Sequence, residues 1–127
     1  MRVLIADDSV LILERLREML GFYRQIEIVG SCKNGIDTLE ALRNLKPDLA
    51  IVDLKMPGLN GLKVLTEIRK ENKTIKIIIL TLFSSDSYRQ KAIQTGADYF
   101  FSKVDDFEKI ELVVAKLVKE ERLGMMM

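Results

Sequence analysis

The sequence has 127 residues, of which 48% are hydrophobic, enough for one domain with a sizeable buried core. Basic and acidic residues nearly balance to a net charge of +1, which argues against a nucleic-acid-binding module. No apolar run reaches the about 20 residues that a membrane helix requires, and the acidic pair Asp7-Asp8 comes too early for a secretory signal, so we expect a cytoplasmic protein without membrane contact.

Short runs of apolar, mostly β-branched residues recur along the chain and alternate with segments of helical spacing. We predict five strands, near residues 2–6, 26–31, 49–52, 75–80 and 99–101. The runs at 49–52 and 75–80 are continuously apolar, as is typical of parallel strands that are covered on both faces.

Five helices are predicted between and after these strands. The first runs from the N-cap candidate Ser9 to the stop signal Gly21, and the second ends before Pro47. The third opens at Asn60, and the fourth, near residues 86–95, has a weak apolar stripe and is followed by Gly96. In chain order, the apolar stripes are Leu13, Leu16 and Leu20; Ile36, Leu39 and Leu42; Leu62, Leu65 and Ile68; Tyr88, Ala92 and Ile93; and Phe107, Ile110, Val113, Val114, Leu117 and Val118.

This alternation predicts an α/β fold in which five helices cover the two faces of a five-stranded parallel sheet, because right-handed crossovers require it. The expected strand order is flavodoxin-like, 2-1-3-4-5; the second strand contributes no charged residue at its end, which suits an edge position. We assign residues 1–122 to one domain and residues 123–127 to a flexible tail.

Polar residues gather where the other four strands end. Asp7 and Asp8 follow the first strand, Asp53 the third and Thr81 the fourth, while Lys103 stands just beyond the fifth. Ligands of such sheets bind at the carboxyl ends of the strands, so we expect these side chains to converge. In a chain without histidine, three carboxylates favour a hard divalent cation, Mg²⁺ first and Mn²⁺ as an alternative. The competing interpretation is that loop aspartates such as Asp8 only cap helices.

An aspartate beside a bound cation can attack a phosphoryl group and form an acyl phosphate. Lys103 would then supply a second positive charge, and the Thr81 hydroxyl a hydrogen bond to the phosphoryl oxygens. The predicted site contains no general base, which suits a protein that receives a group better than an enzyme that turns over a substrate.

Taken together, these residues resemble the motifs of response-regulator receiver domains, from Arg2 to about Arg122. The matching residues are Asp7-Asp8, Asp53, Met56-Pro57-Gly58, Gly61, Thr81, Gly96-Ala97 and Lys103. The resemblance implies that Asp53 accepts a phosphoryl group from a sensor histidine kinase or a histidine phosphotransfer protein. It implies Mg²⁺ ligands at Asp7, Asp8, Asp53 and the backbone carbonyl of Lys55, catalytic roles for Lys103 and Thr81, and a switch pair formed by Thr81 and Phe100.

The resemblance further implies an output to a protein target through the helix near 86–95, the strand near 99–101 and the helix that follows, with a homodimer as one arrangement. Direct contact with nucleic acid would require a longer native chain with an effector domain. The only activities implied are self-phosphorylation and self-dephosphorylation.

Several positions depart from the family pattern. Val104 stands where the family usually has a proline, and a non-proline cis bond costs about 3 kcal/mol, so we predict a trans bond or a rearranged loop. Leu82 is larger than the usual small residue and leaves less room beside a phosphoryl group, and Phe100 lacks the hydroxyl of the commoner tyrosine. Lys55 and Phe83 occupy positions that tune phosphoryl lifetime in this family, and their size and charge suggest a long-lived phosphoaspartate.

Two alternatives remain at this stage. A haloacid dehalogenase-like phosphohydrolase would need Asp-x-Asp after the first strand and usually a cap domain, whereas Asp7 and Asp8 are adjacent. A receiver that no longer takes phosphate and acts only as an interaction module is compatible with Leu82 and Val104, although Asp53, Thr81 and Lys103 are intact.

Overall fold

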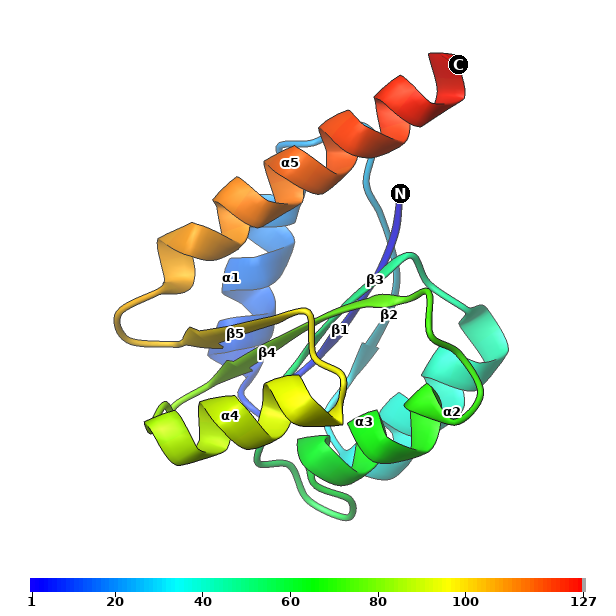
Figure 1. Cartoon of the computed structure of the whole chain (residues 1–127). Coiled ribbons are helices and arrows are strands. Elements are labelled where there is room, and N and C mark those ends of the chain that lie inside the picture. Colours follow the sequence, from blue (N-terminus) through cyan, green and yellow to red (C-terminus); the bar gives the residue numbers. More distant parts are fainter. Residues whose placement is uncertain (127) are drawn as a thin grey trace.

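A parallel sheet with the strand order β2-β1-β3-β4-β5 lies at the centre of the structure, a computed structural model that describes residues 1–126 (Figure 1). The predicted order is confirmed, and β2 lies at an edge as expected. β2 and β4 each begin and end one residue later than predicted, and β5 extends one residue further, to Ser102. The first ladder pairs of β2 and β4 are Arg2 with Glu27 and Leu49 with Lys76. The strands are β1 (Arg2–Ala6), β2 (Glu27–Cys32), β3 (Leu49–Val52), β4 (Lys76–Thr81) and β5 (Tyr99–Ser102).

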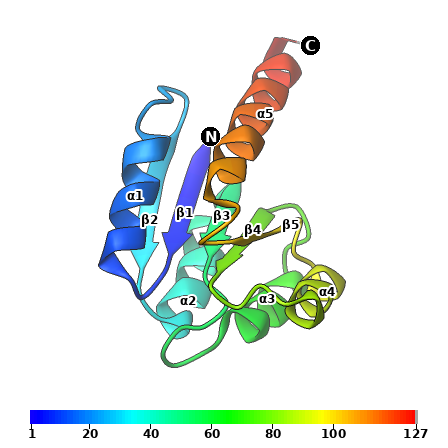
Figure 2. The same ribbon diagram turned by 90° about the vertical axis from the view of Figure 1, so that its left-hand side faces the viewer.

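Helices cover both faces of the sheet, with α1 and α5 on one side and α2, α3 and α4 on the other (Figures 1 and 2). The first four helices each begin at a side-chain N-cap, respectively Ser9, Asn34, Asn60 and Ser85, which accepts a hydrogen bond from a backbone N–H of the first turn. The helices are α1 (Val10–Leu20), α2 (Gly35–Leu45), α3 (Gly61–Arg69), α4 (Asp86–Thr95) and α5 (Phe107–Met126). None of the helices in residues 1–126 is long and apolar enough to cross a membrane.

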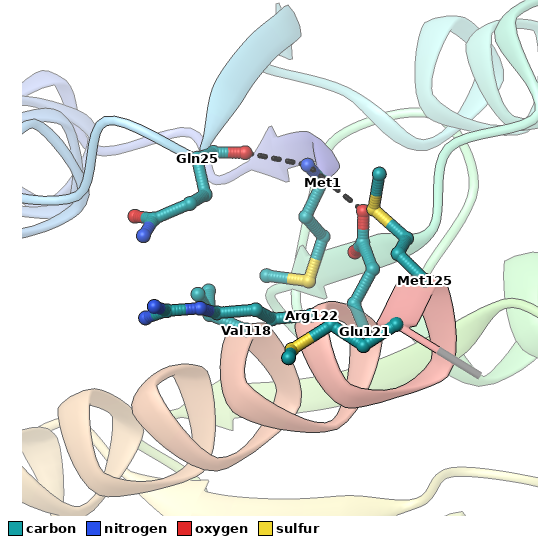
Figure 3. Close-up of a pocket in the computed structure, with 7 residues that line it drawn as sticks. Met1, Gln25, Val118, Glu121, Arg122 and Met125 are labelled. Carbon is teal, nitrogen blue, oxygen red and sulfur yellow. Dashed lines mark hydrogen bonds and ion pairs between the residues drawn. The ribbon is translucent and has the colours of Figure 1, made fainter.

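The C-terminal part of α5 packs near the start of the chain, at the end of the sheet opposite the carboxyl ends of the strands (Figure 3). The terminal ammonium group of Met1 donates a hydrogen bond to the carbonyl oxygen of Gln25 and pairs with a carboxylate oxygen of Glu121 at 3.3 Å. Together with Val118, Arg122, Met125 and Met126, these residues line a cavity of about 280 Å³. Residues 123–126 thus belong to α5, beyond the boundary predicted at residue 122; the flexibility of this tail stays a prediction, and Met127 lies outside the described residues.

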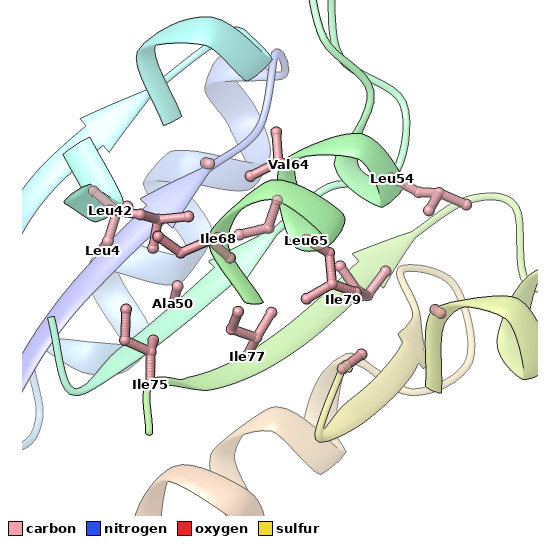
Figure 4. Close-up of a cluster of buried hydrophobic side chains, with 14 of the residues drawn as sticks. Leu4, Leu42, Ala50, Leu54, Val64, Leu65, Ile68, Ile75, Ile77 and Ile79 are labelled. Atoms are coloured by element: carbon pink, nitrogen blue, oxygen red, sulfur yellow. The ribbon is translucent and has the colours of Figure 1, made fainter. Parts of the chain in front are cut away.

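The hydrophobic core has two halves, one on each face of the sheet. Alternate strand residues supply them: Leu4, Ala50 and Ile77 face α2 and α3 (Figure 4), whereas Ile51 and Ile78 face α1 and α5. The predicted stripe of α5 is confirmed, since all six residues from Phe107 to Val118 that compose it are buried.

Two predicted apolar stripes are each wrong at one position: Ile93 in α4 is 45% exposed, and Ile36 in α2 is 62% exposed. The buried positions of that helix include Gly35 and Thr38 instead. A Cβ atom on Gly35 would lie 1.7 Å from the carbonyl oxygen of Leu59, so only glycine permits this approach of α2 to the loop after β3. With Gly35 packed against this loop, the next residue, Ile36, lies at the surface.

Candidate functional site

The register of β1 against β3 brings two of the predicted carboxylates together. Ala6 pairs with Val52, and the Asp53 N–H donates to the Ala6 carbonyl at 2.9 Å, so Asp7 and Asp53 emerge side by side where the ladder ends. Both are buried, whereas Asp8 is exposed. Carboxylate oxygens of Asp7, Asp8 and Asp53 all lie within 4.8 Å of one another, which confirms their predicted convergence at the carboxyl edge.

Lys103 reaches this cluster from the loop after β5. Its ammonium nitrogen lies 2.7 Å from Asp7 Oδ2 and 3.0 Å from Asp53 Oδ2, and its side chain is only 7% exposed. These short distances are expected, because a buried ammonium or carboxylate group loses its hydration and only a close opposite charge offsets that cost.

The surroundings of Asp53 disfavour the charged form of its carboxyl group. Burial raises the pKa of the Asp53 carboxyl, and the neighbouring Asp7 charge raises it further, while Lys103 only partly offsets the rise. Burial by itself lowers the pKa of Lys103, but its bonds to Asp7 and Asp53 and their charges outweigh burial and leave it raised. A site with three carboxylates and one ammonium group carries excess negative charge, so its oxygen-only ligands fit a hard divalent cation.

Thr81 ends β4 on the other side of Asp53, and its backbone is tied to the same edge. Its carbonyl accepts from the Lys103 N–H at 2.9 Å, and its Oγ accepts from the Phe83 N–H at 3.0 Å. The fully buried Thr81 and Phe100, which is 1% exposed, lie on adjacent strands. The guanidinium carbon of Arg89 lies 5.1 Å from the Phe100 ring centroid, a contact that links α4 to this aromatic ring.

The β3–α3 loop holds Lys55 beside the acceptor candidate. The Lys55 N–H donates to Asp53 Oδ1 at 3.4 Å, and its ammonium nitrogen lies 5.3 Å from the Phe83 ring centroid. A ligand role for the Lys55 carbonyl stays a prediction.

Gly61 fixes the far end of this loop. Its N–H donates to the Leu54 carbonyl at 2.7 Å, and a Cβ atom here would lie 2.4 Å from the carbonyl oxygen of Asp53. The start of α3 therefore packs directly on the backbone that carries Asp53, and only glycine leaves room for it.

The departures from the family pattern have limited structural effects. All peptide bonds in the described part of the chain are trans, as predicted for Lys103–Val104. Leu82 is 63% exposed and Val104 76% exposed, so both side chains extend largely into solvent at the rim of the site.

Comparison with known proteins agrees with this geometry. The sequence model described as response regulator receiver domain matches residues 3–115. The chain belongs to the response-regulator receiver family. Transcriptional regulatory protein BtsR of Escherichia coli strain K12 is 36% identical, over 94% of this chain and 48% of its own length. The uncharacterized transcriptional regulatory protein YvfU of Bacillus subtilis strain 168 is 32% identical, over 96% of this chain and 61% of its own length.

Among solved structures, the REC domain of AraT, a response regulator from Geobacillus stearothermophilus, is 30% identical with a TM-score of 0.84, covering 98% of this chain and 97% of that one. The receiver domain is thus shown along nearly the whole chain, whereas the curated relatives BtsR and YvfU are up to about twice as long. Receiver domains of two-component systems are phosphoacceptor switches, and neither the phosphohydrolase nor the non-phosphorylated module is favoured by these matches.

Sequence reasoning missed three residues that contribute to the receiver site or its surroundings. Ser102 and Asp106 close the loop that carries Lys103: the Ser102 N–H donates to Asp106 Oδ2 at 3.0 Å, and the Asp106 N–H donates to the Ser102 carbonyl at 3.0 Å. Arg89, over Phe100, was also not predicted. The available signal was weak, since one buried aspartate three residues after the lysine is a common loop feature.

Proposed function

We propose that Asp53 is the phosphoacceptor of this receiver domain and that its phosphorylation requires Mg²⁺, for which Mn²⁺ can substitute. The observation that carries the proposal is the Lys103 ammonium group, held between the buried Asp7 and Asp53 carboxylates at 2.7 and 3.0 Å. This arrangement keeps a cation next to the oxygen at which the phosphoryl group would be transferred.

The residues around Asp53 have distinct roles in this proposal. Asp7, Asp8, Asp53 and the Lys55 carbonyl would hold the metal ion, which neutralises charge on the phosphoryl oxygens when bound. An Asp53 carboxylate oxygen attacks phosphorus as the bond to the donor breaks. Lys103 and the Thr81 hydroxyl then bind the oxygens of the transferred group.

Phosphorylation would reach the protein surface through Thr81 and Phe100. Thr81 would move toward the phosphoryl group, and the packing of Phe100 and Arg89 would change with it. Only Ala92 is fully buried in α4, so a modest change at Phe100 is sufficient to bias this helix. The surface formed by α4, β5 and α5 is the proposed contact for a downstream protein or a second copy of the chain.

The donor would be a sensor histidine kinase or a histidine phosphotransfer protein in the cytoplasm. BtsR and YvfU are named as transcriptional regulatory proteins, and this chain spans 48% and 61% of their lengths. An effector domain that contacts nucleic acid would lie in the part of such proteins that this chain does not match.

Intact mass measurement after incubation with acetyl phosphate and Mg²⁺ tests the proposal. The wild-type protein should gain one phosphoryl group, and Asp53→Ala should gain none. Asp105→Asn is the matched control, because Asp105 is an exposed carboxylate two residues from Lys103 and should leave phosphorylation intact. Phosphorylation of Asp53→Ala would assign the acceptor to another residue.

We further propose that Lys55 and Phe83 give a long-lived phosphoaspartate by obstructing water. Their backbone N–H groups bond to the side chains of Asp53 and Thr81, at 3.4 and 3.0 Å, so both side chains start at the site. Lys55→Ala and Phe83→Ala should each shorten the lifetime of the phosphorylated protein, and unchanged decay would contradict this role.

A further inference from the structure

Three side chains form a cation–aromatic cluster that we call the Lys55 cluster: Lys55, Phe83 and Tyr88. The Lys55 ammonium nitrogen lies 5.3 Å from each of the two ring centroids. The rings themselves meet edge to face, with centroids 6.1 Å apart and an angle of 63° between their planes. One ammonium group thus contacts two rings that also contact each other, which restricts all three side chains.

The Lys55 cluster bridges two segments that flank the phosphoacceptor candidate. Lys55 belongs to the β3–α3 loop, Phe83 to the β4–α4 connection and Tyr88 to the first turns of α4. Because the backbone of Lys55 bonds to Asp53 and that of Phe83 to Thr81, the cluster is anchored to both sides of the site. Tyr88 has no such hydrogen bond to Asp53 or Thr81 among the described residues; its ring contacts Lys55 and Phe83 and also packs against the core on the α2–α4 side of the sheet.

We propose that the Lys55 cluster is a gate over Asp53, in which Tyr88 is a positioning residue that holds Lys55 and Phe83 across the path to phosphorus. This inference rests on the proposed role of Asp53 as the acceptor. The Tyr88 ring keeps the lysine side chain and the Phe83 ring in one arrangement, and its loss lets them move apart.

The geometry of phosphoryl transfer gives the gate a distinctive consequence. In loading by acetyl phosphate, a bond forms between phosphorus and an Asp53 oxygen while the bond to the acetyl oxygen breaks, and acetate leaves with the electron pair. In hydrolysis, a water oxygen bonds to phosphorus while the bond to Asp53 breaks; the carboxylate is restored, inorganic phosphate leaves, and the proton passes to solvent. Attacking and leaving oxygens lie roughly in line, so acetate leaves along the path by which water enters.

A gate on this shared path slows both reactions, so opening it accelerates both. A residue that stabilised the phosphoryl group chemically would instead change the ratio of the two rates. An exposed cation–π contact has an energy that corresponds to a rate change of about two- to fivefold.

The test compares Tyr88→Leu with the matched control Tyr88→Phe, which retains the ring. Loading is followed by intact mass with acetyl phosphate and Mg²⁺, and hydrolysis by the decay of phosphorylated protein after the donor is removed. We expect Tyr88→Leu to accelerate loading and decay by about the same factor of two to five, with little change in steady-state phosphorylation, and Tyr88→Phe to behave as the wild-type protein.

Lys55→Met separates a gate from a general packing defect. In this proposal Tyr88 acts through Lys55 and Phe83. Tyr88→Leu should therefore change the rates of loading and decay less in the Lys55→Met background than in the wild-type protein. The gate is overturned if Tyr88→Leu is phosphorylated with unchanged rates of loading and decay, or if the two rates change in opposite directions. Either result leaves Asp53 as the acceptor. If the wild-type protein gains no phosphoryl group, or if Asp53→Ala gains as much as the wild-type protein, both the proposed acceptor and the gate are overturned.

Discussion

Ser102 and Asp106 are joined by two hydrogen bonds of 3.0 Å, and between them they close the loop that presents Lys103 to the acidic site. The Ser102 hydroxyl oxygen also accepts from the N–H groups of Val104 and Asp105, at 3.2 and 3.3 Å. This loop therefore has its own hydrogen-bond network, which explains how Lys103 is held with valine in place of the usual proline.

The first prediction concerns the pH dependence that this loop confers. The bond from the Ser102 N–H lowers the pKa of Asp106, and Lys109 lowers it further. Because the folded-state pKa lies below the unfolded value of about 3.9, the stabilisation is complete above that value and is lost as the pH falls through the folded pKa. Asp106→Asn should cost about 1 kcal/mol near pH 7, and the difference from wild type should vanish at low pH. The difference in unfolding free energy between the two proteins is measured by urea unfolding in the presence of EDTA at a series of pH values.

Asp105→Asn is the control for this loop, since Asp105 is exposed and contributes only its backbone N–H to Ser102. Its unfolding free energy should follow the wild-type value across the same pH series. A difference between Asp106→Asn and wild type that does not shrink as the pH falls below the unfolded-state pKa, or the absence of a difference at pH 7, would show that the Asp106 carboxylate does not stabilise the loop.

The acidic site could be predicted because the apolar runs of β1 and β3 stop at aspartates. Asp7 and Asp53 stand directly after such runs, and a parallel sheet brings the carboxyl ends of its strands to one edge. Residue type and strand order were sufficient to predict this convergence.

The loop network and the Lys55 cluster could not be predicted in the same way. Whether Asp106 bonds to Ser102, or Tyr88 meets Lys55, depends on the backbone path between elements, which no local periodicity encodes. In α2 the reason was steric: Gly35 approaches the backbone of Leu59, and this contact overrides the apolar stripe that includes Ile36.

The second prediction concerns metal binding at the three carboxylates. Mg²⁺ that binds the folded state alone stabilises it by about 2.7 kcal/mol at 100 times its dissociation constant. Asp8 is exposed, so Asp8→Asn should leave the metal-free stability nearly unchanged but shift the Mg²⁺ dependence to higher concentration. Thermal unfolding over a Mg²⁺ titration, with an EDTA baseline, reports both quantities. Glu18→Gln is the control: it removes an exposed carboxylate of α1 that is outside the cluster and should not shift the Mg²⁺ titration. Equal shifts in Asp8→Asn and Glu18→Gln would contradict specific Mg²⁺ binding at the three carboxylates.

The third prediction tests how α3 positions Asp53. Gly61→Ala would place a Cβ atom 2.4 Å from the Asp53 carbonyl oxygen and 2.9 Å from the Leu54 Cα, so backbone must move. We expect destabilisation of about 1–3 kcal/mol together with slower loading by acetyl phosphate. Gly124→Ala is the matched control: apart from the neighbouring backbone of α5, no described atom lies within 4 Å of the added methyl group. A helical alanine there should stabilise the protein by up to about 1 kcal/mol. Wild-type loading in Gly61→Ala would mean that this contact does not position the acceptor.

The fourth prediction concerns Phe100 and the helix that covers it. Phe100 is among the largest fully buried side chains, so Phe100→Ala should lower the free energy of unfolding by about 3–5 kcal/mol. Tyr99 points to the opposite face and is only partly buried, and Tyr99→Ala should cost less. Arg89 adds a second contribution, because its guanidinium carbon lies 5.1 Å from the Phe100 centroid at the surface of α4.

A double-mutant cycle separates these contributions. Arg89→Met with Phe100→Leu should show a coupling energy of about 0.5–1 kcal/mol, the size of an exposed cation–π contact. The same cycle between Arg89→Met and Tyr99→Ala should give no coupling, because Tyr99 lies on the α1–α5 side of the sheet. The coupling energy between Arg89 and Phe100 is measured in the unphosphorylated and in the phosphorylated protein. If it is present in the first and changes in the second, Arg89 transmits the change at Phe100 to α4. Coupling that is zero in both states would remove Arg89 from that route and leave the transmission to side-chain packing around Phe100 alone.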